Sequence, residues 1–230
     1  MMTGRQACKP IANRPTATPR QNGFTLVEIG ISLAIIGLMI SGAMKGREMI
    51  TNTRLKKIES EYAGIAVAID TYRDRYRAIP GDDSNASTRF TLYSDGVDDP
   101  APADIDGDGS GVLDGSWRGA AGTETSNLWK HLRAADLISG SGDIATRPRN
   151  VFGGDIGVRD GSLRIAGQVI VLGRIDGMVA GILESHLDDN NPSSGNFQSD
   201  LAPELMDVQA ISTAGPHYDD GNLYFMALSI

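Results

Sequence analysis

One stretch of the sequence constrains the fold more than any other. Residues 24–44, FTLVEIGISLAIIGLMISGAM, contain a single charged side chain, Glu28. At about 1.5 Å per residue these 21 residues would form a helix of roughly 31 Å, which matches a bilayer hydrocarbon core of about 30 Å. The run therefore predicts a membrane-spanning helix. A carboxylate inside such a span costs about 2.5 to 3.5 kcal/mol, so we expect Glu28 to be paired and functional.

The charge is unevenly distributed along the chain. Residues 1–23 carry four basic side chains and no acidic one, whereas the rest of the chain holds 17 of the 21 basic residues and all 29 acidic ones. We expect the basic leader to stay on the cytoplasmic side of the membrane. An acidic body argues against general nucleic-acid binding. The single cysteine, Cys8, lies in the leader, so no intramolecular disulfide can form.

A cut between Gly23 and Phe24 would give Glu28 a partner. Phe24 would gain a free ammonium group, and Glu28 would become the fifth residue of the new chain, one helical turn away. The ion pair could form within one subunit, or with the terminus of a neighbour in an assembly of parallel helices.

A basic leader ending in glycine, followed by GFTLVE at residues 23–28 and an apolar helix, resembles the processing site of type IV pilins and of type II secretion pseudopilins. The resemblance implies that prepilin peptidase cuts after Gly23, that Phe24 is then N-methylated, and that Glu28 docks the subunit into a helical filament. Two features depart from the family. The leader is long, and no proline interrupts residues 24–60, where many pilins carry one.

The same resemblance implies partners and a location. The partners are prepilin peptidase, other pilin or pseudopilin subunits, an inner-membrane assembly platform and membrane lipid. The chain would be a single-pass protein of the bacterial inner membrane with a cytoplasmic N-terminus, and later part of a periplasmic or extracellular filament.

Four segments are expected: a leader over 1–23 that is removed, a transmembrane and assembly helix over 24–44, its amphipathic continuation over 45–79, and an extracytoplasmic domain over 80–230 with a loop at 94–123. The continuation carries apolar side chains at spacings of 4, 3, 4, 3 and 4, namely Ile58, Tyr62, Ile65, Ile69, Tyr72 and Tyr76. We predict that this stripe packs on the chain's own globular domain; the alternative is a short coiled coil with another subunit.

The remaining pattern predicts an α+β fold in which the long N-terminal helix packs on a C-terminal antiparallel β-sheet, as in pilins. Strands are expected over 151–160, 162–175 and 222–230, and a short helix over 178–187. Another helix is expected over 124–140, capped by Thr125 or Ser126, with Trp129 in the core and His131 on the surface.

The sequence DGDGSGVLD, which starts at residue 106, has the spacing of a calcium loop. Oxygen atoms recur at alternate positions 1, 3, 5, 7 and 9, with glycine at position 6 and leucine at position 8, as in an EF-hand-like loop. The candidate ligands are Asp106, Asp108, Ser110, the carbonyl of Val112, and Asp114. Position 12 is Trp117 rather than glutamate, so a further ligand must come from elsewhere, from Asp104 or Glu124. The alternative is an acidic turn without an ion.

A second acidic stretch, HLDDNNPSSGNF at residues 186–197, resembles a loop found towards the C-terminus of some family members. Here Asp188, Asp189 and Asn191 either coordinate a cation or build an Asx turn before Pro192.

No motif indicates an enzyme: the three histidines are scattered, and neither a phosphate-binding loop nor a Gly-x-Ser-x-Gly elbow is present. The resemblance instead implies a structural subunit of a type IV pilus-like filament, minor or specialised because of its size. A tip-located adhesive or DNA-capturing pilin is another form of this interpretation. The alternative is a pseudopilin of a type II secretion system. Outside the family, the alternative is a single-pass membrane protein with an extracytoplasmic sensing or binding domain.

Overall fold

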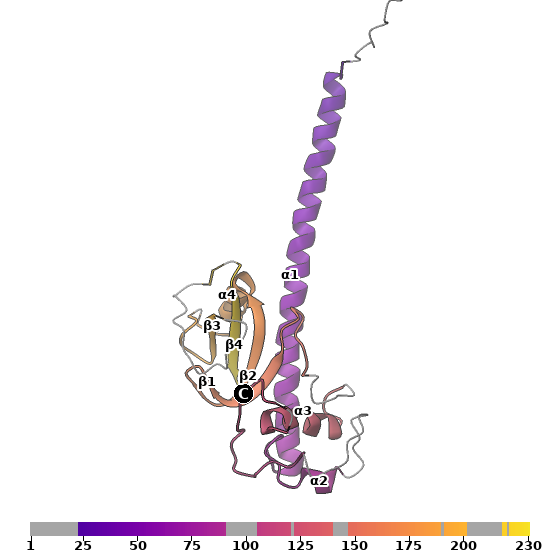
Figure 1. Ribbon diagram of the computed structural model, residues 1–230. Helices are drawn as coiled ribbons and strands as arrows, with labels where there is room; N and C mark the ends of the chain where they lie inside the picture. Colours follow the sequence, from indigo (N-terminus) through magenta and orange to yellow (C-terminus); the bar gives the residue numbers. More distant parts are fainter. Residues whose placement is uncertain are drawn as a thin grey trace, which may run out of the picture. The chain divides into compact units, whose positions relative to one another are not determined.

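The computed structural model describes residues 23–90, 105–120, 122–139, 147–189, 191–201, 218–219 and 221–230. The chain divides into two compact units, Met1–Arg47 and Glu48–Ile230. The elements follow in the order α1 (Leu26–Tyr76), α2 (Ala86–Arg89), α3 (Glu124–Ala134), β1 (Ile156–Ser162), β2 (Ile165–Asp176), α4 (Gly177–Leu187), β3 (Phe197–Leu201) and β4 (Leu223–Ser229) (Figure 1).

The part of α1 in the first unit is exposed on every side. Its large apolar side chains, from Leu26 to Met44, are about half exposed or more. Among the described residues, α1 is the one helix long and apolar enough to cross a membrane. Because the amide and carbonyl groups of a helix bond to one another, the segment meets the backbone requirement of a bilayer span.

The part of α1 in the second unit buries one stripe. The prediction that this stripe packs on the chain's own domain is confirmed, because its residues share a hydrophobic core with the sheet. Ile58 and Tyr72 are almost fully buried, and Tyr62 donates a hydrogen bond of 2.7 Å to the carbonyl of Ser229 at the end of β4. The buried side chains of this helix are Leu55, Ile58, Ile65, Ala68, Ile69 and Tyr72.

The four strands form one antiparallel sheet in the order β1-β2-β4-β3, which confirms the predicted fold class. One row of cross-strand neighbours runs through all four strands and belongs to the core shared with α1: Val158, Ile170, Leu228 and Phe197. Side chains alternate between the faces of a strand, so the intervening residues point to the opposite face.

That opposite face carries a second, smaller core. Val171, Phe225 and Ala227 lie there and are covered by Trp117, whose ring centroid is 5.2 Å from that of Phe225. Gly157 permits this contact, because a Cβ atom at this position would come within 2.6 Å of the Trp117 ring. The residue at position 12 of the suspected calcium loop is therefore a core residue.

All three predicted strands are present: β4 lies where it was predicted, β2 begins three residues later than predicted, at Ile165, and β1 begins five residues later, at Ile156. The side chain of Asn150 accepts hydrogen bonds from the amides of Phe152 and Gly154, which folds the preceding residues into a turn. Strand β3 was not predicted. Its five residues, FQSDL, have an apolar side chain only at each end, so they carry little of the alternation that marks a strand.

The predicted helix over 124–140 is shorter in the structure. It begins at Glu124 with Thr123 in the N-cap position, and it ends at Ala134. Thr125 and Ser126 were therefore wrongly predicted as caps: they lie in the first turn, where Ser126 Oγ donates back to the Thr123 carbonyl. Asp136 adopts a left-handed backbone with φ of 57°, which ends the helical path before residue 140.

His131 was expected on the surface but is completely buried. Its Nδ1 accepts a hydrogen bond of 2.8 Å from the Gly81 amide, so its Nε2 carries the proton and donates to the Ile105 carbonyl at 2.7 Å. Its ring stacks on Tyr72, with centroids 5.9 Å apart. The prediction failed because residues from two distant turns cover a helix face that periodicity alone assigns to solvent.

Burial lowers the pKa of His131 below its ordinary value of 6.5. The unfolded chain therefore binds a proton more readily, and we expect stability to be highest above about pH 6.5 and to fall as the pH drops below that value. His131→Phe should lower the free energy of unfolding at neutral pH by about 1 to 3 kcal/mol for each buried group left without a partner. It should also flatten the acid dependence.

Urea unfolding of the full-length chain in detergent, followed by circular dichroism at two pH values, measures both effects. His186→Phe, which removes a half-exposed histidine whose Nδ1 lies 3.2 Å from Glu59 Oε1, is the matched control for the loss of a histidine at the surface. If His131→Phe and His186→Phe have the same stability and the same pH dependence, the buried histidine does not connect the two turns.

Candidate functional site

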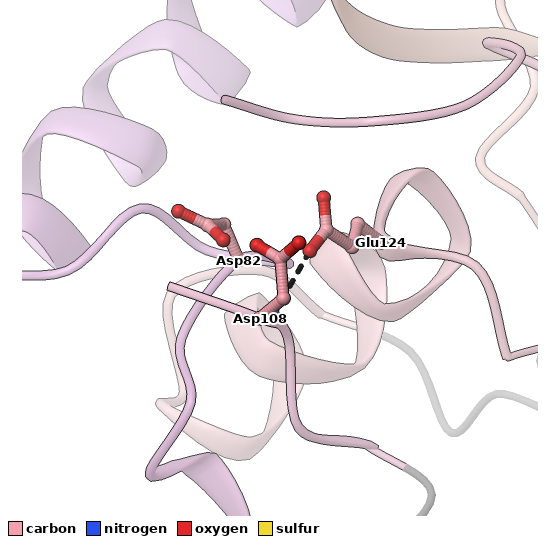
Figure 2. A group of neighbouring side chains, drawn as sticks. All are labelled: Asp82, Asp108 and Glu124. Atoms are coloured by element: carbon pink, nitrogen blue, oxygen red, sulfur yellow. Dashed lines mark hydrogen bonds between the residues drawn. The ribbon is translucent and has the colours of Figure 1, made fainter. Parts of the chain in front are cut away.

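The structure brings three carboxylates together beside the suspected calcium loop. Asp82 follows the Pro80-Gly81 turn after α1, Asp108 lies in the loop, and Glu124 is the first residue of α3 (Figure 2). One carboxylate oxygen from each lies within 4.8 Å of the others. We call these three residues the first acidic cluster.

Two members of this cluster anchor the loop through its backbone amides. Asp82 accepts hydrogen bonds from the amides of Ser110 at 3.0 Å and Gly111 at 2.7 Å. Glu124 accepts from the amides of Asp108 at 3.1 Å and Asp114 at 2.8 Å, and Figure 2 draws the former as a dashed line. Gly111 has φ of 86°, a left-handed conformation that glycine adopts without strain. The loop thus folds around carboxylates from outside it.

The pKa values of Asp108 and Glu124 are shifted in opposite directions. Hydrogen bonds from Ser110, first of all from its backbone amide, lower the pKa of Asp108. Burial raises the pKa of Glu124, against the hydrogen bonds that it accepts from the amides of Asp108 and Asp114. Asp82 is almost fully buried and Asp108 is exposed, so the cluster reaches from the interior to the surface.

The ligands predicted from the sequence are only partly brought together. Asp108 and Glu124 lie in the cluster, whereas Asp106 turns towards α2, where it accepts hydrogen bonds from the amide and hydroxyl of Ser87. Ser110 Oγ lies 3.3 Å from the carbonyl oxygen of Val112. Asp114 bonds to Glu124 through its amide, and Asp104 lies outside the described residues.

Asp82 is the member that the sequence prediction missed. It is separated from Asp108 by 26 positions, so no local spacing connects the two residues. Its only signal was its place directly after Pro80-Gly81, where the chain turns at the end of the long helix.

A second acidic cluster consists of Glu184 in α4 and of Asp188 and Asp189, which follow that helix; one carboxylate oxygen from each lies within 4.8 Å of the others. Glu184 is fully buried, and its Oε2 accepts a hydrogen bond of 2.9 Å from the Tyr218 hydroxyl. The pKa of Glu184 is raised to about 7, chiefly by burial and also by the two neighbouring aspartates, against the hydrogen bond from Tyr218 and the backbone amide of Asn191.

The loop after α4 also contains the predicted turn. Asp189 Oδ1 accepts from the Asn191 amide at 3.0 Å, and Asn191 Oδ1 accepts from the Ser193 amide at 3.2 Å. The Asx turn before Pro192 is thus confirmed. Of the three ligands predicted from the sequence, Asp188 and Asp189 lie in the cluster. Its third member is Glu184 rather than the predicted Asn191.

The N-terminal segment offers an accessible backbone ahead of a capped helix. Gly23 is exposed, and no atom lies within 4 Å of where its Cβ would be. The side chain of Thr25 accepts a hydrogen bond of 3.2 Å from the Glu28 amide and so caps α1. Glu28 lies in the first turn, where the helix dipole favours a negative charge. Its carboxylate forms no hydrogen bond or ion pair with the described residues.

Residues 18–44 match the family model of the prokaryotic N-terminal methylation motif. The chain carries a prepilin-type N-terminal segment. Neither the curated proteins nor the solved structures contain a match to the chain. The assignment therefore rests on this segment together with the α+β arrangement of helix and sheet.

A prepilin-type segment implies processing by prepilin peptidase and assembly with other pilin subunits. Its apolar helix is compatible with single-pass anchoring in an inner membrane. The accessible backbone at Gly23 and Phe24 suits cleavage, since a peptidase must reach an extended segment of the chain.

Proposed function

We propose that this chain is a structural subunit of a type IV pilus-like filament, minor or specialised, which enters the inner membrane as a prepilin and is processed at Gly23. The observation that carries the proposal is the prepilin-type segment at the start of α1, whose residues up to Arg47 are exposed on every side. This part of the helix therefore requires apolar surroundings at both stages: lipid before assembly, and the helices of neighbouring subunits in the filament.

Apolar surface of this extent cannot stay in water. Leu26 and Leu38 are 90% and 78% exposed, and they lie in the first part of α1, where every residue is exposed. Transfer from the bilayer into a bundle of equivalent helices keeps such side chains away from water. A helical filament of these chains supplies that bundle.

Cleavage would place a cationic group at the unfavourable end of a helix. The N-terminus of a helix carries a partial positive charge, so the new ammonium of Phe24 is repelled there while Glu28 is favoured. A pair between Glu28 of one subunit and Phe24 of its neighbour would neutralise both groups in an apolar environment. The geometry thus supports an assembly role for Glu28.

A pseudopilin of a type II secretion system is the second candidate, because it carries the same kind of segment. A single-pass membrane protein with a sensing or binding domain would keep its leader. The state of the N-terminus separates that last alternative from the other two.

We also propose that one calcium ion binds the first acidic cluster through Asp82, Asp108 and Glu124. Calcium takes six to eight oxygen ligands, and carboxylates can serve as ligands while they accept amide hydrogen bonds. The three residues come from the turn after α1, the loop and α3, so an ion would connect segments that no disulfide can join.

The processing prediction concerns the terminus. Mass spectrometry of the chain from its native host should find a mature protein that begins at N-methylated Phe24. Gly23→Val should block cleavage, because a branched side chain obstructs the peptidase, whereas Gly30→Val, in the exposed first half of α1, should be processed normally. A mature protein that retains its leader would contradict the proposal.

The assembly prediction concerns Glu28. Glu28→Leu should insert into the membrane at least as well as wild type and be cleaved normally, since leucine suits the bilayer. Its incorporation into sheared filaments should fall steeply, because removing one partner of a buried ion pair costs about 3 to 5 kcal/mol. Immunoblots of sheared and membrane fractions measure this. Glu48→Leu, on the same helix, is the control, and wild-type incorporation of Glu28→Leu would exclude an assembly role.

The calcium prediction separates Asp108 from Asp106. Calcium should raise the melting temperature of the full-length chain in detergent, measured in a Glu184→Gln background so that the second cluster does not contribute. Asp108→Asn should abolish the rise. Asp106→Asn should lower the melting temperature equally with calcium and with chelator, because Asp106 bonds to Ser87 rather than to the ion. Equal melting temperatures of the parent with calcium and chelator would show that the loop folds without an ion.

A further inference from the structure

We propose that the second acidic cluster is a binding site for a hard divalent cation of the size of calcium, with Glu184 as its buried ligand. The site would connect the C-terminal end of α4 to the loop that leads into the edge strand β3. The proposal is independent of the filament function, because it rests on residues of the globular unit only.

The first observation is the arrangement of the oxygen atoms. Glu184, Asp188 and Asp189 each place one carboxylate oxygen within 4.8 Å of the other two. Calcium binds oxygen at 2.3–2.6 Å, so ligands on opposite sides of one ion lie roughly 4.6 to 5.2 Å apart. The three oxygens therefore lie at separations of the size that ligands of one shared ion have.

The second observation is an unsatisfied buried atom. Oε1 of Glu184 is buried and has no hydrogen-bond partner among the described residues. The Asn191 amide is near enough to lower the pKa of Glu184, but it donates its hydrogen bond of 3.0 Å to Asp189 Oδ1. Its other oxygen is held by the Tyr218 hydroxyl, which in turn accepts a hydrogen bond from Ser199 of β3. A buried carboxylate oxygen without a partner is costly, and a cation supplies the missing interaction.

The third observation concerns charge. No lysine, arginine or histidine of the described residues forms an ion pair with any of the three carboxylates. Both aspartates have ordered side chains: Asp188 Oδ2 accepts from the Phe197 amide at 2.8 Å, and Asp189 Oδ2 accepts from Ser194 Oγ at 2.8 Å. Hydrogen bonds thus hold the two aspartates in place, and the described part of the chain provides no positive group to balance them.

The ligand chemistry selects the class of ion. All three groups are carboxylates, and no cysteine or histidine of the described residues joins the cluster, so hard cations are favoured over transition metals. Asp189 is exposed, so water can complete the coordination from the open side. The ion would tie the end of α4 to the first residue of β3 through Asp188, whose carboxylate already contacts Phe197.

The test is calcium titration of the full-length chain in detergent, by calorimetry and by terbium luminescence, in an Asp108→Asn background that disables the first cluster. Tyr218 lies 2.9 Å from Glu184, so excited tyrosine should transfer energy to terbium at the site. We expect one site, from which calcium displaces terbium at lower concentration than magnesium does. Glu184→Gln and Asp189→Asn should each weaken binding at least about tenfold.

Asp176→Asn is the matched control. It removes one negative charge from the N-cap of the same helix, and asparagine can still cap α4 by accepting a hydrogen bond from the Met178 amide. Its affinity should equal that of the parent. Should Glu184→Gln fail to fold, Asp189→Asn is the deciding variant. Position 189 is exposed, and the side-chain oxygen of the new asparagine can still accept the hydrogen bond from the Asn191 amide. Absence of binding in the parent, or equal affinity in all three variants, would overturn the proposal.

Discussion

The packing of one sheet face on the buried stripe of α1 is the contact on which the rest of the globular unit depends. The row of Val158, Ile170, Leu228 and Phe197 crosses all four strands and joins the same core as Ile58, Ile69 and Tyr72. Only one stripe, in the second half of α1, packs into that core, so the apolar side chains of the first half remain exposed. One part of the helix therefore serves the fold, and the other part is left for the membrane and for assembly.

The connections between these elements are held by polar side chains, since the chain has no pair of cysteines. Asp82 and Glu124 accept the amides of the acidic loop, and His131 joins the turn after α1 to Ile105. This network positions the chain so that Trp117 reaches the opposite face of the sheet, where Gly157 leaves room for its ring. The smaller core therefore depends on hydrogen bonds made by residues that are remote from it.

Much of the fold could be predicted because its main elements have long, regular patterns. The 51 residues of α1 and the apolar runs of β2 and β4 are examples, and the motif at Gly23, Phe24 and Glu28 is local in sequence. What escaped prediction depends on contacts between distant segments. Asp82 joins Asp108 only after the chain has turned, His131 is buried by two separate turns, and β3 is a strand chiefly because β4 offers it an edge. None of these contacts leaves a periodic signal.

Glu28 and Glu184 both carry a carboxylate that forms no ion pair with the described residues. Glu28 lies in an apolar span where the described residues offer it no partner, and another molecule or a terminus that cleavage creates could balance its charge. Glu184 lies buried inside the globular unit beside two more carboxylates. The ion that we propose would approach it from the side of exposed Asp189. Burial thus determines the kind of partner: a carboxylate on an open helix can recruit a neighbouring subunit, whereas an enclosed one is restricted to what diffuses in.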